Sequence, residues 1–379
     1  MTHTNIVNPT LTIGIPAYNE AENIERIVKE FLSTAYPNLI EVFVADGGST
    51  DGTQDIVKNL ALEDPRVKLV HNPLKIQSCG LNIIIKECKG DIFLRADSHS
   101  DYASDYLERC VETLIESKAL NAGGAQRFVA KQTFQAAIAL ASKSILGNGG
   151  AHYRNPNHTG FVDTVYLGCF WKKSLLELPQ KCEPYQELPV NEDFELNIHL
   201  SKCVFDNSQI TNQDAELDQK LITVKPKAIY QSNKIKVWYY PRKTWESLLL
   251  QYFKYGRGRY LTTSKHPLTL QIRGIIPFTV IFLAIFILII DLLFPSLGLP
   301  IKTLFLFGVC LPFLDSLRLN LQYSKTFSTE IWRGDADAMP SFLSLWFFCG
   351  VVLLTMPIAH ASGYAYQLVR HRVFRVSDW

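Results

Sequence analysis

Acidic and polar side chains follow three short apolar runs in the first hundred residues. They occupy Pro16–Glu20, Asp46–Gly52 and Asp97–His99. One such acid is an ordinary turn residue or helix cap, and Asp51 suits capping as well as function. Acids after all three runs together indicate a site for a nucleotide-type ligand.

Short strands and helices must position these residues. We expect strands at Leu11–Ile15, Glu41–Ala45, Val67–Val70 and Asp91–Ala96, and helices at Glu20–Leu32, Asp51–Leu62 and Gln77–Cys88. This strand–helix alternation predicts a parallel sheet with right-handed crossovers. Ligands of such sheets bind at the carboxyl ends of the strands, where the three polar segments fall.

The turn after the first strand excludes two common nucleotide sites. Gly14–Asn19 does not read Gly-x-Gly-x-x-Gly, and the chain has no Gly-x-x-x-x-Gly-Lys-[Ser/Thr]. A dinucleotide oxidoreductase and a P-loop NTPase therefore lose their main support. A divalent metal at Asp97 and His99 is the candidate for holding phosphate, because a carboxylate favours Mg²⁺ or Mn²⁺ and an imidazole favours Mn²⁺. The alternative is that Asp97 and His99 only form the turn at the end of a strand.

The charge balance and the cysteines narrow the class of protein. The 379 residues carry 38 Lys and Arg and 36 Asp and Glu, a net charge of +2, which argues against a nucleic-acid partner. The eight cysteines form no CxxC or zinc spacing. We expect them to be reduced thiols, as in a cytoplasmic protein.

The C-terminal third has a different composition. Only eight basic and six acidic side chains fall in Gln271–Trp379. Ile275–Phe294 has Asp291 as its one ionisable residue, and twenty helical residues span about 30 Å, the thickness of a bilayer core. We expect a transmembrane helix there. Thr303–Leu314 is short for a full span, and Phe342–Val369 is long enough but contains Pro357.

The distribution of charge suggests how the chain is oriented. Met1–Thr10 is polar and has no charged-then-apolar signal sequence. We therefore expect the soluble part on the cytoplasmic face of the inner (plasma) membrane. Arg370 and Arg372 also favour the inside. Two topologies remain open: Thr303–Leu314 is re-entrant, or the last segment turns back near Pro357.

Several ordered motifs resemble the inverting family 2 glycosyltransferases of GT-A fold. The similarity covers about residues 10–260, and the branch it resembles is the membrane-attached, succinoglycan-type exopolysaccharide glucosyltransferases. The motifs are Ile15–Glu20, Ala45–Gly52, Cys79–Asn82, Arg95–His99, Asn191–Leu196, Tyr240–Arg242 and Gln251–Arg259.

The resemblance implies an α/β GT-A nucleotide-sugar-binding fold with a mostly parallel sheet, followed by C-terminal transmembrane helices. We expect a cytoplasmic catalytic domain at 1–240, an interfacial amphipathic segment at 241–271, and a transmembrane region at 272–379 with two or three membrane helices. The expected donor is a UDP-sugar, with glucose as the first candidate. The expected acceptor is a polyprenyl-linked saccharide.

The family pattern also assigns residue roles. Asp46 is expected at the uracil or ribose, with Pro16–Glu20 as one wall of the pocket. Asp97 matches the first acid of the metal motif, and His99 stands where many members have a second Asp; related GT-A enzymes with Asp-x-His use Mn²⁺. The implied nucleotide-sugar site comprises Pro16, Tyr18, Glu20, Asp46, Gly48, Asp51, Asn82 and Asp97.

Asp193 is the expected catalytic base, with Glu192 as the alternative base or as a neighbour that raises the pKa of Asp193. An acid pair that opens a helix is the structural alternative. Gln251, Arg257 and Arg259 are expected to hold the acceptor or its diphosphate, although a basic, aromatic interfacial anchor explains the same residues. Membrane lipid and other polysaccharide assembly proteins are further candidate partners.

Two rival functions remain open from the sequence. A processive polysaccharide synthase carries Gln-x-x-Arg-Trp where this chain has Gln251–Tyr255, which favours single addition. A catalytically inactive scaffold of a polysaccharide assembly complex stays open because of His99. Long polymer from one enzyme indicates the first, and absence of turnover indicates the second.

Overall fold

The computed structural model describes residues 8–148, 152–177, 213–265, 276–294 and 301–376. Two compact units are present. Unit 1 comprises Met1–Ala125 and His158–Val237, and unit 2 comprises Gln126–Asn157 and Trp238–Trp379.

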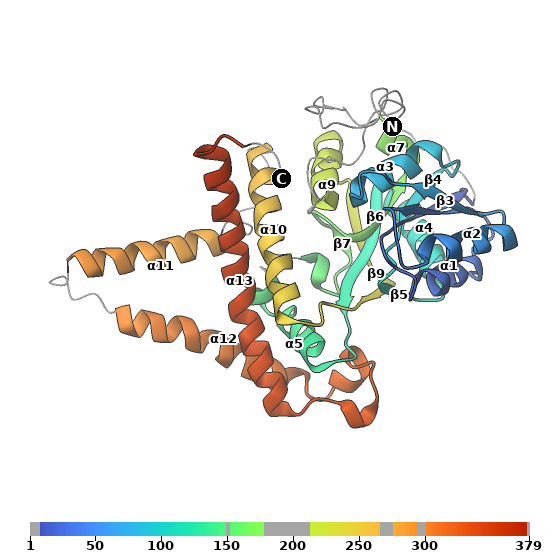
Figure 1. The fold of residues 1–379 in the computed structure, drawn as a ribbon. Coiled ribbons are helices and arrows are strands. Elements are labelled where there is room, and N and C mark those ends of the chain that lie inside the picture. Colours follow the sequence, from blue (N-terminus) through green and yellow to red (C-terminus); the bar gives the residue numbers. More distant parts are fainter. Residues whose placement is uncertain (1–7, 149–151, 178–212, 266–275, 295–300, 377–379) are drawn as a thin grey trace. The chain divides into compact units, whose positions relative to one another are not determined.

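A nine-stranded sheet forms the centre of unit 1, in the order β3-β2-β1-β4-β8-β6-β9-β5, with β7 paired to β9 (Figure 1). β1 pairs in parallel with β2 and β4, and β2 pairs in parallel with β3, whereas β8 is antiparallel to both β4 and β6. The strands are β1 (Leu11–Ala17), β2 (Leu39–Asp46), β3 (Val67–His71), β4 (Ile92–Arg95), β5 (Ser100–Tyr102), β6 (Asn121–Phe128), β7 (Gly160–Phe161), β8 (Tyr166–Trp171) and β9 (Ile229–Tyr239).

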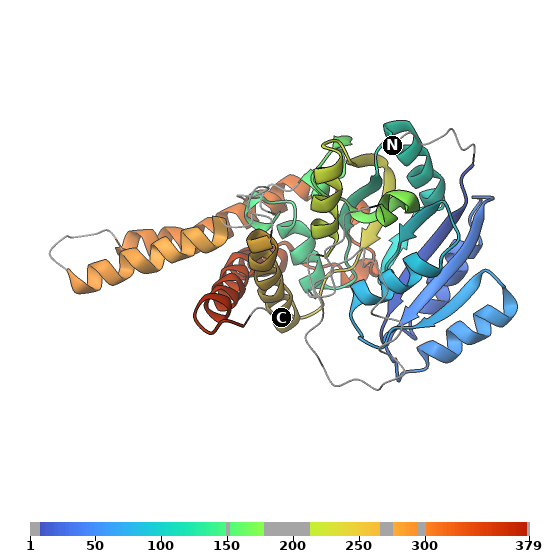
Figure 2. The ribbon, with the colours of Figure 1, turned by 90° about the horizontal axis from the view of Figure 1, so that it is seen from above.

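Helices cover both faces of this sheet (Figure 2). Apolar side chains of α1, α2 and α4 are buried against one face, and those of α3, α7 and α9 against the other. Val42 and Val44 of β2 point to the first layer and Phe43 and Ala45 to the second, as the period of a strand requires. The helices are α1 (Ile24–Leu32), α2 (Thr53–Glu63), α3 (Gln77–Glu87), α4 (Tyr106–Ser117), α7 (Lys172–Leu176) and α9 (Gln213–Val224).

The predicted GT-A-like α/β architecture with its parallel strands is confirmed. Each expected strand and helix of the first hundred residues occurs within a few residues of its predicted bounds. The main shift is at α1, which begins at Ile24 rather than at Glu20. The carbonyl of Glu20 accepts hydrogen bonds from the N–H groups of Asn23 and Ile24, so the chain turns there before the helix starts.

Unit 2 is mainly helical. A second apolar core joins α5 to residues of α10, α12 and α13, with Leu248, Leu319 and Leu353 among its members. The elements are α5 (Thr133–Ala141), α6 (Ile145–Asn148), η1 (His152–Arg154), α10 (Trp245–Lys265), α11 (Ile276–Leu293), α12 (Ile301–Tyr323), η5 (Phe327–Ile331), η6 (Ala336–Ala338) and α13 (Phe342–Arg372).

The helices of the C-terminal third differ in part from expectation. The helix expected at Ile275–Phe294 is present as α11, whereas the short apolar segment extends into the 23 residues of α12. The alternative in which the last segment turns back near Pro357 is wrong, because α13 is one helix of 31 residues that runs through this proline. Proline removes a single backbone donor, and neighbouring turns can carry the helix past it.

Among the described residues, α13 is the helix long and apolar enough to cross a bilayer, judged by length and composition. The apolar part of α11, Phe278–Leu293, is shorter. Large apolar side chains of α11 and α12 are nevertheless exposed, including Leu292 at 71% and Phe305 at 73%. The buried core helix of a soluble protein can have the same length and composition.

Two glycines allow α10 and α13 to approach closely. A Cβ added at Gly256 would collide with the carbonyl oxygen of His360, and one added at Gly363 with the carbonyl oxygen of Phe253. Small residues at such crossings let helix backbones touch. The two glycines therefore allow α13 to pack closely against α10, the helix that carries the basic side chains.

Gly363→Ala is expected to lower the free energy of unfolding of unit 2 by about 1–3 kcal/mol, because the new methyl group overpacks backbone atoms. Thermal unfolding of the purified chain followed by circular dichroism measures the effect. Gly308→Ala in α12 is the matched control, since a Cβ there meets nothing within 4 Å. Equal unfolding temperatures for the two variants would contradict this account of the helix crossing.

Candidate active site at the carboxyl ends of the strands

Asp46, the last residue of β2, is buried and shapes the turn that follows it. Its Oδ2 atom accepts hydrogen bonds from the backbone N–H groups of Gly48 at 2.8 Å and Ser49 at 3.0 Å. Its Oδ1 atom accepts one from the Ser49 hydroxyl at 2.5 Å. Gly48 has a φ of +79°, which an L side chain rarely adopts. The carboxylate therefore fixes a tight backbone loop at the edge of the sheet.

The loop after β1 is hydrogen-bonded to this turn. The backbone N–H of Asn19 donates to the Ser49 hydroxyl at 2.8 Å, and the N–H of Thr50 donates to the Asn19 side-chain oxygen at 2.9 Å. Asn19 has a φ of +55°, a conformation that Asn tolerates better than most residues. These reciprocal bonds keep two strand ends in one assembly.

Asp51 makes a second link between the same loops. Its carboxylate accepts hydrogen bonds from the Ala21 N–H at 3.0 Å and from the Thr53 hydroxyl at 2.6 Å. The Thr53 hydroxyl in turn accepts from the N–H of Glu20 at 2.8 Å. The Thr53 hydroxyl bond, followed by the Ala21 N–H, lowers the pKa of Asp51. The N-cap of α2 is Gly52 rather than Asp51, and the Asp51 carboxylate instead links the two loops.

Asp97 lies on the turn after β4, and Tyr102 stabilises this turn. The Tyr102 hydroxyl accepts a hydrogen bond from the Asp97 N–H at 2.8 Å and donates one to the Asp97 carbonyl at 3.0 Å. The side-chain oxygens of Asp97 lie 3.2 Å from the Tyr166 hydroxyl and 3.5 Å from the Arg95 guanidinium. Burial, and then the charge of Asp97, raises the pKa of Tyr102, so its hydroxyl stays protonated.

His99 connects the end of β4 to the loop after β1. Its Nε2 atom lies 2.7 Å from Oε1 of Glu20, a contact that becomes an ion pair when the imidazole is protonated. The Glu20 side chain is 8% exposed and that of His99 is 55% exposed. All three predicted strand ends therefore meet in unit 1.

Comparison with known proteins decides the family. Residues 12–171 match the family described as Glycosyl transferase family 2. The succinoglycan biosynthesis protein ExoA of Rhizobium meliloti is 34% identical over 282 residues, which cover 74% of this chain and 78% of ExoA. The chain belongs to glycosyltransferase family 2. It is therefore a glycosyltransferase, and the expected likeness to succinoglycan-type enzymes is confirmed.

One further relative and one solved structure align with most of this family 2 glycosyltransferase. An enzyme of Methanococcus voltae, named dolichyl N-acetyl-α-D-glucosaminyl phosphate 3-β-D-2,3-diacetamido-2,3-dideoxy-β-D-glucuronosyltransferase, is 27% identical over 80% of this chain and 92% of its own. The solved mannosyltransferase of Pyrobaculum calidifontis, in complex with GDP-mannose and Mn²⁺, has a TM-score of 0.51 at 15% identity. That alignment covers 96% of this chain and 88% of the other, and it supports the fold.

The donor atoms at the end of β4 suit a divalent cation in this glycosyltransferase. Asp97 supplies a carboxylate whose side chain is 18% exposed, and His99 supplies an exposed imidazole two residues further along. Among the residues that the structure describes, no three His, Cys, Asp or Glu side chains gather into a complete metal cage. The residues fit a cation that takes its remaining ligands from a diphosphate and water.

Lys75 is a functional candidate that the sequence patterns did not single out. It lies in the loop between β3 and α3 with a φ of +58°. Its side chain passes over the Asp46 turn, because a Cβ built on Gly48 would lie 3.8 Å from the Lys75 ammonium nitrogen. A lysine at this point brings a positive charge to a glycine-rich loop, where a phosphate can approach the backbone closely. No residue pattern around a single lysine predicts that placement.

The other residues predicted for the nucleotide-sugar site differ in their exposure to solvent. Tyr18 is 54% exposed, Pro16 beside it is half-buried, and Asn82 of α3 is buried. Glu192 and Asp193 lie outside the described residues, so their catalytic roles stay predictions.

The predicted acceptor residues belong to α10 in unit 2. Gln251 donates a hydrogen bond to the Tyr255 hydroxyl at 2.9 Å. Arg257 donates through Nε to the Gln367 side chain at 2.9 Å, and its guanidinium lies 5.2 Å from the centre of the Tyr366 ring. Both partners of Arg257 belong to α13. A helix-bridging role for Arg257 is therefore visible, while its predicted contact with an acceptor stays a prediction.

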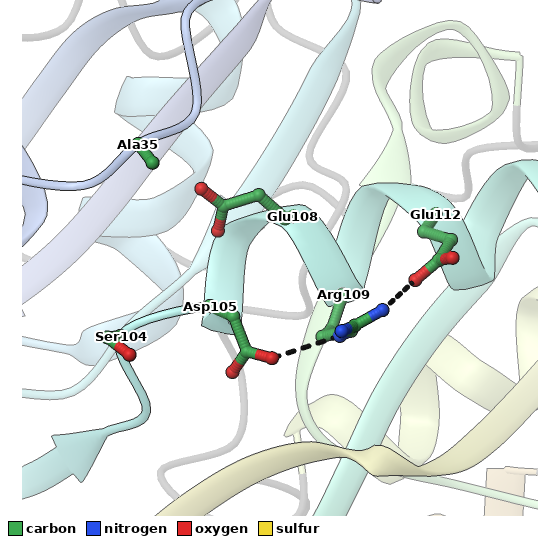
Figure 3. A pocket seen from close by; sticks show the side chains of 6 residues that line it. All are labelled: Ala35, Ser104, Asp105, Glu108, Arg109 and Glu112. Atoms are coloured by element: carbon green, nitrogen blue, oxygen red, sulfur yellow. Dashed lines mark hydrogen bonds and ion pairs between the residues drawn. The ribbon is translucent and has the colours of Figure 1, made fainter.

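A hollow of about 520 Å³ lies elsewhere on unit 1, beside the first turns of α4 (Figure 3). Arg109 projects there between Asp105 at 3.0 Å and Glu112 at 2.8 Å. None of the predicted site residues lines it. The lining residues are Ala35, Ser104, Asp105, Glu108, Arg109 and Glu112.

Tyr102→Phe is expected to lower the free energy of unfolding by about 1–3 kcal/mol, because two buried backbone groups of Asp97 lose their partner. It should also weaken Mn²⁺-dependent UDP binding, since the Asp97 turn loosens. Calorimetric titration of UDP with and without Mn²⁺ measures this. Tyr106→Phe is the matched control, because the Tyr106 ring packs 4.8 Å from Tyr102 but makes neither bond to Asp97. Unchanged UDP binding in Tyr102→Phe would show that the hydrogen bonds of Tyr102 to Asp97 do not support nucleotide binding.

Proposed function

We propose that this glycosyltransferase transfers a sugar from a UDP-sugar to a polyprenyl-linked saccharide at a membrane surface, as a step of exopolysaccharide or glycan assembly. Glucose is the first candidate sugar. The observation that carries the proposal is the joining of three polar strand ends, at Glu20, Asp46 and Asp97, into one loop assembly of unit 1. Asn19 is bonded to the Ser49 hydroxyl of the Asp46 turn, and His99 of the Asp97 turn contacts Glu20.

The donor half of the proposal rests on backbone and charge. Gly47 and Gly48 of the Asp46 turn have no side chains of their own, so a nucleotide can approach the main chain closely between Tyr18 and Lys75. Lys75 brings a cation to that turn. Asp97 and His99 would hold a divalent cation, which when bound neutralises the charge of the departing diphosphate. Uracil is preferred here on the family pattern.

Asp193 is the proposed catalytic base. The acceptor hydroxyl attacks the anomeric carbon on the face opposite the diphosphate. A new carbon–oxygen bond forms as the bond to the diphosphate oxygen breaks, and the configuration inverts. The Asp193 carboxylate takes the hydroxyl proton, a contribution of about 10²–10⁴-fold for a well-placed base. Glu192 orients that carboxylate.

The acceptor half rests on the relatives and on unit 2. The name of the Methanococcus voltae relative describes a sugar acceptor carried on dolichyl phosphate, and that of the Rhizobium meliloti relative describes succinoglycan biosynthesis. In this chain α13 has the length and composition of a membrane span. Exposed apolar side chains on α11 and α12 suit lipid contact. We place the catalytic unit on the cytoplasmic face, with two or three membrane helices after residue 271.

Nucleotide release by the detergent-purified chain tests this function. The panel contains UDP-sugars with Mn²⁺, Mg²⁺ or EDTA, and includes GDP-mannose because the Pyrobaculum calidifontis structure contains it. We expect metal-dependent UDP release, with water as a poor acceptor, that rises when a prenyl-linked saccharide is added. Asp193→Asn should lower the rate by about 10²–10⁴-fold.

Asp55→Asn is the control, because Asp55 is an exposed carboxylate of α2 that pairs with Lys58 at 3.2 Å. It should leave the rate unchanged. If the chain binds UDP tightly but releases it from no donor, even with the prenyl-linked saccharide present, the enzyme proposal is wrong and the inactive-scaffold function is favoured. If the enzyme makes a long polymer from a single donor, it is a processive synthase rather than an enzyme that adds one sugar.

A further inference from the structure

Arg154 occupies an unusual position in unit 2. It ends the short helix η1, and its guanidinium carbon lies 5.2 Å from the centre of the Phe128 ring and 5.6 Å from that of Tyr153. Its Nε atom lies 3.2 Å from the Tyr153 hydroxyl and donates a hydrogen bond to it. The cation is thus held between two aromatic rings from η1 and the end of β6.

The α10 helix adds two more tyrosines to this cluster. The Tyr252 side chain lies near the Arg154 guanidinium, and the Tyr252 and Tyr255 ring centres are 5.5 Å apart. The Tyr255 hydroxyl accepts the Gln251 amide, and burial raises the pKa of Tyr255, so this hydroxyl carries no charge. Gln251, expected from the sequence to contact the acceptor, therefore belongs to the shell around Arg154.

The charge of Arg154 has no counter-charge among the described residues. Its Nη1 atom is buried and has no hydrogen-bond partner, and no described carboxylate forms an ion pair with the side chain. Arginine stays protonated in proteins, so it cannot relieve this by losing its proton. A buried cation is retained at a cost unless it is paired, and the neutral tyrosine hydroxyls only partly offset that cost.

Further positive charge lies beside it. Arg127 donates a hydrogen bond at 3.3 Å to the carbonyl of Pro156, two residues beyond Arg154. Burial lowers the pKa of Lys143 although Glu330 raises it, and the charge of Arg127 adds a smaller lowering. Glu330 lies 3.5 Å from Lys143. Among the described residues, Glu330 therefore pairs with Lys143 and not with Arg154.

We propose that Arg154, with the hydroxyls of Tyr153 and Tyr252, binds a phosphate group of the lipid-linked acceptor. This inference rests on the proposed function, and it names the acceptor group that unit 2 recognises. A guanidinium offers several N–H donors in a fixed plane, which matches phosphate oxygens. Hydroxyl donors complete the coordination without adding a competing negative charge. The phosphate replaces the missing counter-charge.

The surroundings favour a phosphate on a lipid over a free one. The same unit carries α13, with the composition of a membrane span, and the exposed apolar residues of α11 and α12. Aromatic rings around the cation also suit the first apolar carbons of a prenyl chain. Inorganic phosphate and the diphosphate of the nucleotide share the headgroup chemistry, so the experiment must separate these sources.

Binding of farnesyl phosphate to the full-length chain in detergent tests the proposal, with farnesol, inorganic phosphate and UDP as the other probes. We expect farnesyl phosphate to bind at least tenfold more tightly than farnesol or inorganic phosphate. Arg154→Gln should weaken farnesyl phosphate binding at least tenfold and leave UDP affinity within twofold of wild type. Arg333→Gln is the matched control, because Arg333 is an exposed arginine of the same unit, and it should change neither.

Unchanged binding of farnesyl phosphate to Arg154→Gln would overturn the proposal, and so would equal affinity for inorganic phosphate. If Arg154→Gln does not fold, Tyr252→Phe serves instead, since it keeps the ring and removes only a hydroxyl; a several-fold loss for farnesyl phosphate alone is expected. Sugar transfer by wild type separates the two claims. Transfer with unchanged KM for the prenyl-linked acceptor in Arg154→Gln would refute the phosphate site and leave the proposed function standing.

Discussion

β1 lies between β2 and β4 and runs parallel to both, and the whole site depends on this pairing. In its register Ala17 is opposite Asp46 and Gly14 is opposite Arg95, so the chain leaves all three strands at one edge of the sheet. The apolar residues of the strands are buried on both faces, which fixes the register by the cost of exposing them. The buried strands therefore bring the ends that carry Glu20, Asp46 and Asp97 to the same side of the sheet.

The polar edge is stabilised mostly by its own backbone. Asp46 and Asp51 spend their hydrogen-bonding capacity on N–H and hydroxyl groups of the adjacent loops. Tyr102 does the same for the Asp97 turn from a buried position. These bonds arrange the edge before any ligand arrives, and such preorganisation is what a transferase needs to place a donor and a departing diphosphate. The side chains left most open, Tyr18 and His99, are the ones able to adjust to a ligand.

The strands and helices of unit 1 were predictable because their signal is local. Short apolar runs such as Leu11–Ile15 indicate buried parallel strands, and helical spacing indicates the helices between them. The family motifs correctly predicted the family and its α/β fold. The role of Asp46 at a uracil or ribose and the roles of Glu192 and Asp193 stay predictions.

What the sequence did not predict depends on contacts between distant residues. Lys75 is a candidate because it lies over Gly48, and Arg154 because it contacts the Phe128 and Tyr153 rings and pairs with no carboxylate of the described residues. Neither residue stands in a distinctive pattern. The turn near Pro357, one of two alternatives left open by the sequence, does not occur: α13 is one helix that contacts α10 before the proline at Thr355 and after it at Gly363. Tertiary packing decided each of these cases.

Electron paramagnetic resonance of Mn²⁺ tests most directly whether the three strand ends form one nucleotide and metal site. The account predicts that the free Mn²⁺ signal falls on adding the protein only when UDP is also present. It further predicts that Asp97→Asn weakens this binding by about tenfold or more, while Asp55→Asn has no effect. Mn²⁺ and UDP that bind Asp97→Asn as tightly as wild type would contradict it.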